Sequence, residues 1–356
     1  MLGIILRICI KLALFNIQMS INGCYNMKEI SLNSSLTVLK DIIVKNDLMH
    51  EKDQILNIET PGAGNMNVVL RVITQKGSFI LKQSRNYVNK YPQIPAPINR
   101  IDVEAQFYQL IHTSSCSHYL PRLLRYDQTN KIIFLEDLGR SSDYQVLYQK
   151  NIDLSQKDYI SILYFLHQLH NISFSEFQSS QFPKNLALRR LNHEHLFVYP
   201  YSEKNNFDLN EIKPGLQRLA QKMRQDTLLK KAAIQLGKQY LSEGTSLLHG
   251  DYYPGSWLKT KSGFHVIDPE FCFFGPKEYD LGVLRAHLKM AEQPISYLND
   301  FWKHYPASEV NFSLVDQFEG MELIRRIIGL AQLPLNLSLK KMTKLLQEGK
   351  RLLMVS

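Results

Sequence analysis

Two acidic clusters in the second half of the chain are the residues best suited to chemistry. The sequence reads His-Gly-Asp at 249–251 and Asp-Pro-Glu at 268–270, and a Lys-Ser-Gly turn interrupts the apolar segment between them. This pattern predicts a β-hairpin over residues 257–267, whose ends come together, so we expect Asp251 and Asp268 to lie side by side. Neighbouring carboxylates repel unless a cation separates them, and Mg²⁺ takes one or two carboxylates plus phosphate oxygens. The pattern therefore suits phosphoryl transfer.

Either cluster alone is typical of an ordinary tight turn or strand end, but the residues that follow strengthen the pattern. Residues 268–271 read Asp-Pro-Glu-Phe, and Gly275-Pro276 and Asp280 belong to the pattern Phe-Gly-Pro-x-x-x-Asp that follows. The stretch resembles the catalytic core of the aminoglycoside-phosphotransferase and choline-kinase-like superfamily, and it is most similar to methylthioribose kinases. The resemblance implies an α+β, two-lobed, protein-kinase-like fold, with a small N-terminal antiparallel sheet lobe and a larger, mainly helical C-terminal lobe. With this fold, residues 27–135 are expected to form the N-lobe, residues 136–140 the hinge and residues 141–356 the C-lobe. Residues 1–26 precede them as an N-terminal extension.

A glycine-containing loop precedes two predicted strands in the first third of the chain. Gly62 and Gly64 would let backbone N–H groups approach a phosphate closely, although two glycines in a hairpin usually mark only a turn. Lys82 ends the second strand, where a kinase-type fold places the lysine that grips the α- and β-phosphates. Glu104 falls in a helix predicted over residues 101–112 and is the natural partner of Lys82. The alternative for Glu104 is a solvated helix charge.

The resemblance extends to this loop and to the segment after it. Methylthioribose kinases have a similar Gly-x-Gly-Asn-x-Asn loop, followed by Lys-Gln and Tyr-Val, and this chain has the matching residues Gly62, Gly64, Asn65, Asn67, Lys82-Gln83 and Tyr87-Val88. The four loop residues are thereby predicted to bind nucleotide. A strand predicted at 132–135 runs into the segment that resembles the hinge, where the backbone groups of Glu136 and Leu138 would hydrogen-bond adenine.

Other elements are predicted from periodicity and capping residues. Residues 155–170 form an amphipathic pattern with Ser155 as its cap, and we interpret His167 and His170 within it as structural, because no carboxylate or cysteine accompanies them. Asp280 is predicted to cap a helix that begins at Leu281.

Further segments carry weaker signals. Residues 36–57 predict a helix followed by a loop, and residues 171–245 are predicted to be mostly helical. The charge pairs Arg189-Arg190 and Lys230-Lys231 are interpreted as solvated helix faces.

An arginine pair, Arg325-Arg326, lies in an apolar helix predicted over residues 322–329. A buried guanidinium without an anion is costly, so the pair predicts either structural salt bridges within the chain or a nearby anionic ligand. Methylthioribose kinases carry an Arg-Arg-x-x-Gly helix here, implicated in substrate binding and in stabilising the transferred charge, whereas generic aminoglycoside kinases lack the pair.

The predicted reaction is transfer of the γ-phosphoryl group of ATP to a hydroxyl of a small molecule, 5-methylthioribose or a similar acceptor. The predicted catalytic residues are Asp251, which accepts the hydroxyl proton or orients the nucleophile, and Arg325 and Arg326, which face the acceptor and the moving phosphoryl group. Asp268 and Glu270 are predicted to hold Mg²⁺. The superfamily usually places a second metal ligand, Asn, five residues after the catalytic Asp. Here that position is Ser256, as in methylthioribose kinases.

Two departures from the methylthioribose kinase pattern leave the acceptor open. That family usually reads Asp-x-His-Thr-Gly-Ser in the catalytic loop, where this chain has Tyr253-Pro254, and Ala-His after the arginine helix, where it has Ala331-Gln332. One alternative is therefore an aminoglycoside, choline or homoserine phosphotransferase of the same fold. A catalytically inactive nucleotide-binding regulator is another alternative, although the predicted lysine, glutamate and aspartates are all present.

Composition limits the class of protein. The chain has 356 residues, a formal net charge of +9 and four scattered cysteines. That length predicts two domains or lobes, and the cysteine pattern predicts a reducing, cytoplasmic setting without a disulfide framework. The positive charge is consistent with ATP, and no zinc spacing or ribonucleoprotein motif points to nucleic acid. The resemblance suggests a homodimer.

The first 26 residues differ from the rest of the chain. Residues 2–17 are strongly apolar but contain Arg7 and Lys11, and the stretch is too short and too charged for a comfortable spanning helix. Since Met27 begins an ordinary polar N-terminus, we favour a mis-assigned start or a dispensable extension. A membrane anchor is the alternative, and no stable membrane association is expected.

Overall fold

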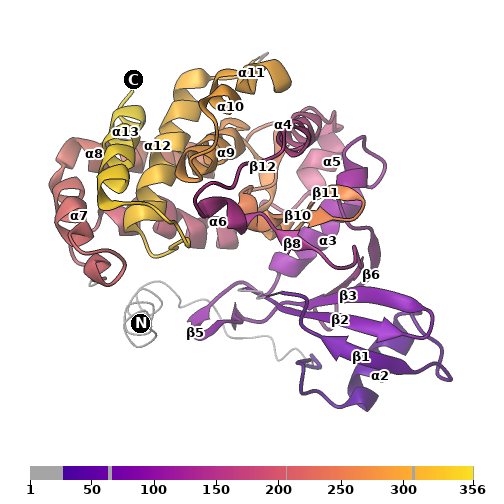
Figure 1. Cartoon of the computed structure of the whole chain (residues 1–356). Coiled ribbons are helices and arrows are strands. Elements are labelled where there is room, and N and C mark those ends of the chain that lie inside the picture. The colour runs from indigo at the N-terminus through magenta and orange to yellow at the C-terminus, as the bar shows by residue number, and fades with distance from the viewer. Residues whose placement is uncertain (1–26, 63–65, 206, 307–308, 356) are drawn as a thin grey trace. The chain divides into compact units, whose positions relative to one another are not determined.

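The computed structural model describes residues 27–62, 66–205, 207–306 and 309–355. They form two compact units that divide between Gly139 and Arg140. The N-terminal unit is built on a five-stranded antiparallel sheet, and the C-terminal unit consists mainly of helices (Figure 1). An antiparallel sheet in one unit and helices in the other confirm the predicted α+β fold class.

The sheet of the N-terminal unit has the strand order β1-β2-β3-β7-β6. Its strands, in chain order, are β1 (Ile55–Glu59), β2 (Val68–Thr74), β3 (Gly77–Gln83), β6 (Leu123–Asp127) and β7 (Ile132–Glu136). A short hairpin of β4 (Tyr87–Val88) and β5 (Tyr91–Pro95) leads into helix α3 (Arg100–Ile111). The sheet thus places the predicted nucleotide loop between β1 and β2, and Lys82 on the central strand β3.

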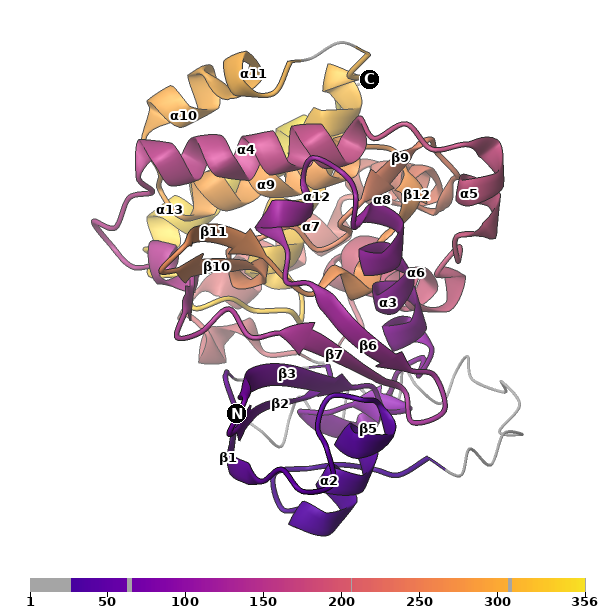
Figure 2. The same ribbon diagram turned by 90° about the vertical axis from the view of Figure 1, so that its right-hand side faces the viewer.

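Helix α2 (Leu36–Lys45) covers one face of this sheet (Figure 2). Leu39 and Ile43 of α2 belong to one buried apolar cluster with Leu81 of β3 and Phe134 of β7. Because side chains alternate between the two faces of a strand, Lys82 points to the opposite face, where α3 lies. Hydrophobic burial on one face therefore aims the lysine at α3.

The C-terminal unit surrounds two small sheets with helices. The sheets are formed by β8 (Ser142–Asp143), β10 (Trp257–Thr260) and β11 (Gly263–Val266), and by β9 (Ser246–Leu248) with β12 (Phe273–Gly275). The helices are α4 (Gln156–His170), α5 (Glu176–Gln181), α6 (Leu186–His193), α7 (Leu216–Gln225), α8 (Thr227–Leu241), α9 (Glu278–Met290), α10 (Ile295–Asn299), α11 (Phe301–His304), α12 (Phe312–Ile328) and α13 (Leu339–Leu353).

Helix α12, which carries the arginine pair, packs very closely against α9 and α13. A Cβ added at Gly282 of α9 would lie 2.6 Å from the Cβ of Phe318, and one added at Gly320 would lie 2.5 Å from the carbonyl oxygen of Gly349 on α13. Real Cβ contacts are not this short, so glycine permits the approach of both neighbouring helices. The position of α12 is therefore tightly fixed within the C-terminal unit.

Several local predictions are confirmed by these elements. Strands β10 and β11 form the predicted hairpin, with Thr260 opposite Gly263. Helix α4 begins after Ser155, whose side chain accepts a hydrogen bond from the Asp158 backbone, as the cap prediction requires. The predicted arginine helix exists, although it begins ten residues earlier than expected, at Phe312.

Two interpretations are wrong. The segment predicted as a loop before residue 57 contains the start of β1, which pairs with β2. Arg189 does not lie on a solvated face, because its side chain is buried, donates to the carbonyl oxygens of Tyr240 and Ser242, and lies 3.9 Å from the ring centre of Phe273. The Arg189 side chain can be buried because carbonyl oxygens distant in sequence accept hydrogen bonds from its guanidinium group.

The N-terminal extension, Gly64 and Asn65 lie outside the described residues, so the predictions made for them remain predictions. Among the helices that the structure describes, none combines the length and the apolar character needed to cross a membrane.

Candidate active site

Lys82 and Glu104 form the first part of the candidate site, within the N-terminal unit. The Lys82 ammonium nitrogen lies 2.9 Å from one carboxylate oxygen of Glu104 and 2.7 Å from the other. The Lys82 side chain is 4% exposed and that of Glu104 is fully buried. The predicted contact is therefore confirmed, and the alternative of a solvated charge on Glu104 is excluded. The pair holds an ammonium group at a fixed position beside β3.

The base of the glycine-containing loop is anchored from inside the N-terminal unit. The Asn67 side chain is buried, and its carboxamide oxygen accepts a hydrogen bond of 3.0 Å from Nε of Arg100. Gly62 is exposed, with nothing within 4 Å of the position that a Cβ would take. Gly62, at the start of the loop, is therefore open to solvent, whereas Asn67, at its end, is held by Arg100.

The segment predicted as a hinge is held by charged side chains of the sheet. The Asp137 carboxylate accepts 2.6 Å and 2.9 Å hydrogen bonds from the Ser78 hydroxyl and the Gly139 backbone, and lies 3.0 Å from Nε of Arg71. Because Arg71 also donates to the carbonyl oxygen of Gly139, the chain around Leu138 is fastened to β2 and β3. The Glu136 backbone N–H donates to the carbonyl oxygen of Arg122.

Asp280 organises the catalytic loop in the C-terminal unit. Its buried carboxylate accepts hydrogen bonds of 2.7 Å and 3.1 Å from the backbone N–H groups of His249 and Gly250. The prediction that Asp280 caps its helix is wrong, because α9 already begins at Glu278 and the carboxylate is committed to the loop. His170 contacts the same carboxylate at 3.2 Å, so the reason given for its structural interpretation, the lack of an accompanying carboxylate, is wrong, because Asp280 lies far away in sequence.

The conformation of the loop requires glycine at position 250. Gly250 has a φ of +82°, and an added Cβ would lie 2.2 Å from the carbonyl oxygen of Phe271. His249 also contacts the carbonyl oxygen of Ile267 at the end of the hairpin, with a 3.0 Å separation. The loop that carries Asp251 is therefore fixed against the segment that carries the second acidic cluster.

Asp251 lies at the end of this loop as a partly accessible carboxylate. Its side chain is 30% exposed. Burial of the carboxyl group raises its pKa to about 6, against the opposing effect of Arg326 and Arg325. A carboxylate with this pKa is mostly ionised at neutral pH and is still a stronger base than an ordinary aspartate.

We expect this pKa to appear in the pH dependence of catalysis. Because only the ionised form accepts a proton, kcat/KM should fall as the pH decreases through about 6. Arg326 lowers the pKa of Asp251, so this pKa should be higher in Arg326→Met. The decrease of kcat/KM on the acidic side should therefore occur at a higher pH in the variant than in the wild type. Steady-state rates between pH 4.5 and 8 check both points. An acidic limb near pH 4, or no displacement in the variant, would contradict this assignment.

The arginine pair is held by one buried carboxylate that the sequence reasoning did not single out. The Glu322 carboxylate lies 2.5 Å from Nε of Arg325 and 2.8 Å from Nε of Arg326. Burial alone would raise the pKa of Glu322, but the two guanidinium groups and His287 hold it well below its usual range. The structural salt bridges, which were one of the two alternatives for the pair, therefore exist, and Nη2 of Arg326 also lies 3.7 Å from Asp251.

A chain of buried side chains supports Glu322 from the other side. His287 of α9 contacts the Glu322 carboxylate through Nε2 at 2.9 Å, and the Tyr148 hydroxyl lies 2.6 Å from its Nδ1. Burial lowers the pKa of His287 to about 4, so the ring is neutral at physiological pH. The neutral tautomer with hydrogen on Nε2 donates to Glu322 and accepts from Tyr148, which satisfies both ring nitrogens. The ring of Tyr253 lies 4.8 Å from the Arg326 guanidinium.

The predicted metal ligands belong to the same unit. Asp268 adopts a left-handed conformation with a φ of +63°, and Glu270 is buried in the short helix that follows. Asn185 holds that helix by donating to the carbonyl oxygens of Glu270 and Cys272, at 2.8 Å and 3.2 Å. The Ser256 hydroxyl donates to the Asp251 carbonyl oxygen at 2.8 Å.

This donor set fits Mg²⁺ better than a metal bound by the protein alone. In the part of the chain that the structure describes, no group of three His, Cys, Asp or Glu side chains is arranged to hold a metal. Mg²⁺ commonly takes only one or two carboxylates and completes its coordination with phosphate oxygens and water. Asp268 and Glu270, which are hard oxygen donors on either side of a proline, match that requirement.

The residues that the sequence reasoning missed have signals of different strength. Glu322 stands three and four residues before the two arginines, so helical spacing could have identified it as their partner. His287, Tyr148 and Asn185 carry no such signal, because their contacts join segments far apart in the chain.

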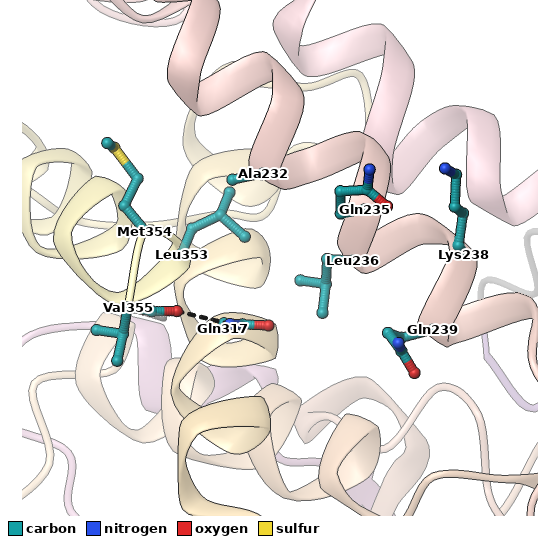
Figure 3. A pocket seen from close by; sticks show the side chains of 9 residues that line it. All are labelled: Ala232, Gln235, Leu236, Lys238, Gln239, Gln317, Leu353, Met354 and Val355. Atoms are coloured by element: carbon teal, nitrogen blue, oxygen red, sulfur yellow. Dashed lines mark hydrogen bonds between the residues drawn. The ribbon is translucent and has the colours of Figure 1, made fainter.

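A groove elsewhere in the C-terminal unit contains none of the predicted site residues (Figure 3). Its volume is about 310 Å³, and it lies between α8 and the ends of α12 and α13, where Gln317 donates to the carbonyl oxygen of Val355. A second cavity of about 410 Å³, near residues 148–153, touches the site only through Tyr148.

Comparison with known proteins assigns most of the chain to a family. Residues 57–310 match the model of the phosphotransferase enzyme family. Methylthioribose kinase 1 of Oryza sativa subsp. japonica is 29% identical over 250 residues, which cover 66% of this chain and 56% of the relative. Methylthioribose kinase of Bacillus cereus is 26% identical over 314 residues, covering 76% of this chain and 78% of the relative. The matched region thus spans little more than half of the rice protein.

Solved structures show the same fold at low sequence identity. An ethanolamine kinase of Plasmodium vivax aligns with a TM-score of 0.52 and 13% identity, covering 93% of this chain and 91% of that one. A choline/ethanolamine kinase family protein of Mesorhizobium loti aligns with a TM-score of 0.51 and 14% identity, covering 89% of this chain and 95% of that one. The predicted kinase-like fold is therefore confirmed.

Proposed function

Because this chain belongs to the phosphotransferase enzyme family, we propose that it is a kinase that transfers the γ-phosphoryl group of ATP to a hydroxyl group of 5-methylthioribose. The observation that carries the proposal is the grouping of Asp251, Arg326 and Glu322 in the C-terminal unit. It combines a partly accessible base with a guanidinium group whose orientation is fixed.

The proposed chemical step uses Asp251 as the base. The acceptor oxygen attacks the γ-phosphorus and forms a new O–P bond, while the bond from the γ-phosphorus to the bridging oxygen breaks and its electron pair leaves with ADP. The hydroxyl proton passes to the Asp251 carboxylate, whose raised pKa suits this role. Arg325 and Arg326 stabilise the negative charge of the moving phosphoryl group. Electrostatic positioning accounts for most of the proposed catalysis.

The N-terminal unit is proposed to hold the nucleotide. Lys82 grips the α- and β-phosphates, and Glu104 keeps its ammonium group in place. The backbone around Gly62 and the loop residues after it approach the phosphates, while the backbone at Glu136 and Leu138 binds adenine. In this proposal the segment 136–140 is the hinge between two lobes.

Magnesium is proposed to be held by Asp268 and Glu270, with Ser256 nearby. Bound there with ATP, the ion would neutralise phosphate charge. The protein's own contribution is to fix the backbone that carries both carboxylates, through the left-handed conformation at Asp268 and the hydrogen bond from Asn185 to the Glu270 carbonyl oxygen.

The arginine pair favours methylthioribose among the possible acceptors, because Arg325-Arg326 and Gly329 match the Arg-Arg-x-x-Gly pattern in which this chain resembles methylthioribose kinases. In that case the product is the 1-phosphate, an intermediate of methionine salvage. One observation favours another small hydroxyl acceptor, such as choline, homoserine or an aminoglycoside. The Tyr253 ring lies against Arg326, at a place where the methylthioribose kinase pattern differs.

A panel of acceptors tests this proposal. The purified full chain is incubated with Mg-ATP and methylthioribose, choline, homoserine or kanamycin, and ADP release is followed in each case. Methylthioribose-dependent turnover is the expected result. Turnover with another acceptor alone would overturn the methylthioribose assignment and retain the kinase. ATP binding without turnover on any of them would favour an inactive nucleotide-binding regulator.

A cytoplasmic location and a homodimer are further parts of the proposal. Cys116 and Cys272 are both buried thiols, which supports a reducing compartment. The homodimer rests on family resemblance, and sedimentation of the purified chain would decide it.

A further inference from the structure

Arg100, at the start of α3, connects three segments around the nucleotide loop. Its side chain is 1% exposed, and all its guanidinium nitrogens donate hydrogen bonds to neutral carbonyl oxygens. Nε donates to the Asn67 side-chain oxygen at 3.0 Å. Nη1 donates to the carbonyl oxygens of Arg85 and Pro97, at 2.6 Å and 2.9 Å. Nη2 donates to the carbonyl oxygens of Met66 and Tyr87, at 2.7 Å and 3.4 Å.

These contacts meet at the end of the glycine-containing loop. Met66 and Asn67 are the last residues of the loop before β2 begins at Val68. The Met66 carbonyl oxygen also accepts from the Asn89 backbone, so the β4–β5 hairpin holds the same point. The planar guanidinium group suits this task, because its five donors have a fixed geometry that a lysine cannot reproduce.

The position of Arg100 on α3 links this anchor to the ion pair. Arg100 and Glu104 are four residues apart, so they lie on the same face of the helix. Arg100 binds the loop, and Glu104 binds Lys82. One helix therefore fixes two elements proposed to contact the phosphates of ATP.

We propose that Arg100 is a positioning residue for nucleotide binding, which fixes Met66 and Asn67 relative to Lys82 without contacting ATP itself. The inference rests on the proposed nucleotide-binding function of the N-terminal unit. If the anchor is lost, the backbone of Met66 and Asn67 moves relative to the Lys82 ammonium group, and displacements of about 1 Å are enough to reduce activity strongly.

The test compares Arg100→Lys with Arg85→Lys in the full chain. Arg85 is a control in the same unit. Its side chain is also buried, but it binds Glu29, the carbonyl oxygen of Ile30 and the Tyr87 hydroxyl, and none of these contacts is with Met66 or Asn67. We expect Arg100→Lys to weaken ADP binding in calorimetry, and to raise KM for ATP, about tenfold, with a smaller change in kcat and in acceptor KM. Arg85→Lys should lower thermal stability without changing nucleotide affinity.

A second variant covers the case in which Arg100→Lys does not fold. Asn67→Ala removes only one acceptor of the guanidinium group and should weaken ADP binding in the same direction by a smaller factor. Asn67→Asp, which keeps an acceptor oxygen, should bind ADP more tightly than Asn67→Ala.

Three results would be decisive against the inference. These are unchanged ADP affinity in Arg100→Lys, an equal loss in Arg85→Lys, or unchanged affinity in Asn67→Ala. Failure of the proposed nucleotide-binding role of the N-terminal unit, on which the inference rests, is distinguishable, because the wild-type chain would then bind no ADP, whereas a wrong acceptor assignment would leave ADP binding intact.

Discussion

Replacing Asp251 with asparagine should lower kcat by about 10²- to 10⁴-fold, which is the contribution usual for a positioned general base. The amide has the same shape as the carboxylate but cannot accept the hydroxyl proton. Because burial already disfavours the charge on Asp251, the neutral side chain should leave the free energy of unfolding within about 1 kcal/mol of wild type. Rates of ADP release and denaturant unfolding measure the two quantities.

Asp53→Asn provides the control for this prediction. Asp53 is an acidic residue of the N-terminal unit that pairs with Lys76 at the surface, so its replacement should leave kcat unchanged. An Asp251→Asn enzyme that retains more than about a tenth of wild-type kcat would rule out a general-base role for Asp251.

Replacing Glu322 with glutamine should produce a large loss of stability together with a loss of activity. The variant leaves two buried guanidinium groups without their shared counter-ion, and breaking a buried ion pair in this way costs about 3–5 kcal/mol. Since Arg326 would also lose the contact that orients it toward Asp251, kcat should fall further than stability alone explains. Unfolding in urea and kcat at a temperature where the variant is folded give the two effects.

The same helix offers a matched control. Glu319 lies one turn before Glu322, is fully buried, and pairs with Arg285 and Lys289, neither of which contacts Asp251 in the described structure. Glu319→Gln should therefore lose stability to a similar extent but keep most of its kcat. Equal effects of the two variants on kcat would show that Glu322 acts only through stability.

The parts of the site that could be predicted are those that depend on short-range order. The Lys-Ser-Gly turn between apolar runs is enough to predict the hairpin of β10 and β11, since the turn dictates the pairing. Lys82 ends a strand and Glu104 lies on the next long helix, so their contact followed from the order of the elements.

The parts that could not be predicted depend on partners far apart in the chain. Asp280 has the sequence signature of a helix cap, but its contacts with the distant residues His249, Gly250 and His170 explain its burial. Arg189 has the signature of a solvated charge, yet carbonyl oxygens some fifty positions later accept from it. Local propensity is a weak guide wherever tertiary contacts satisfy a polar group.

Phosphorus NMR of the reaction products tests the central claim most directly. The full chain is incubated with Mg-ATP and methylthioribose, and the spectrum is followed with time. The proposal predicts that ADP and one phosphate monoester appear in equal amounts, with the ester phosphorus coupled to the proton on carbon 1, and that Asp251→Asn forms neither at a comparable rate. Unchanged ATP, or release of inorganic phosphate without an ester, would contradict it.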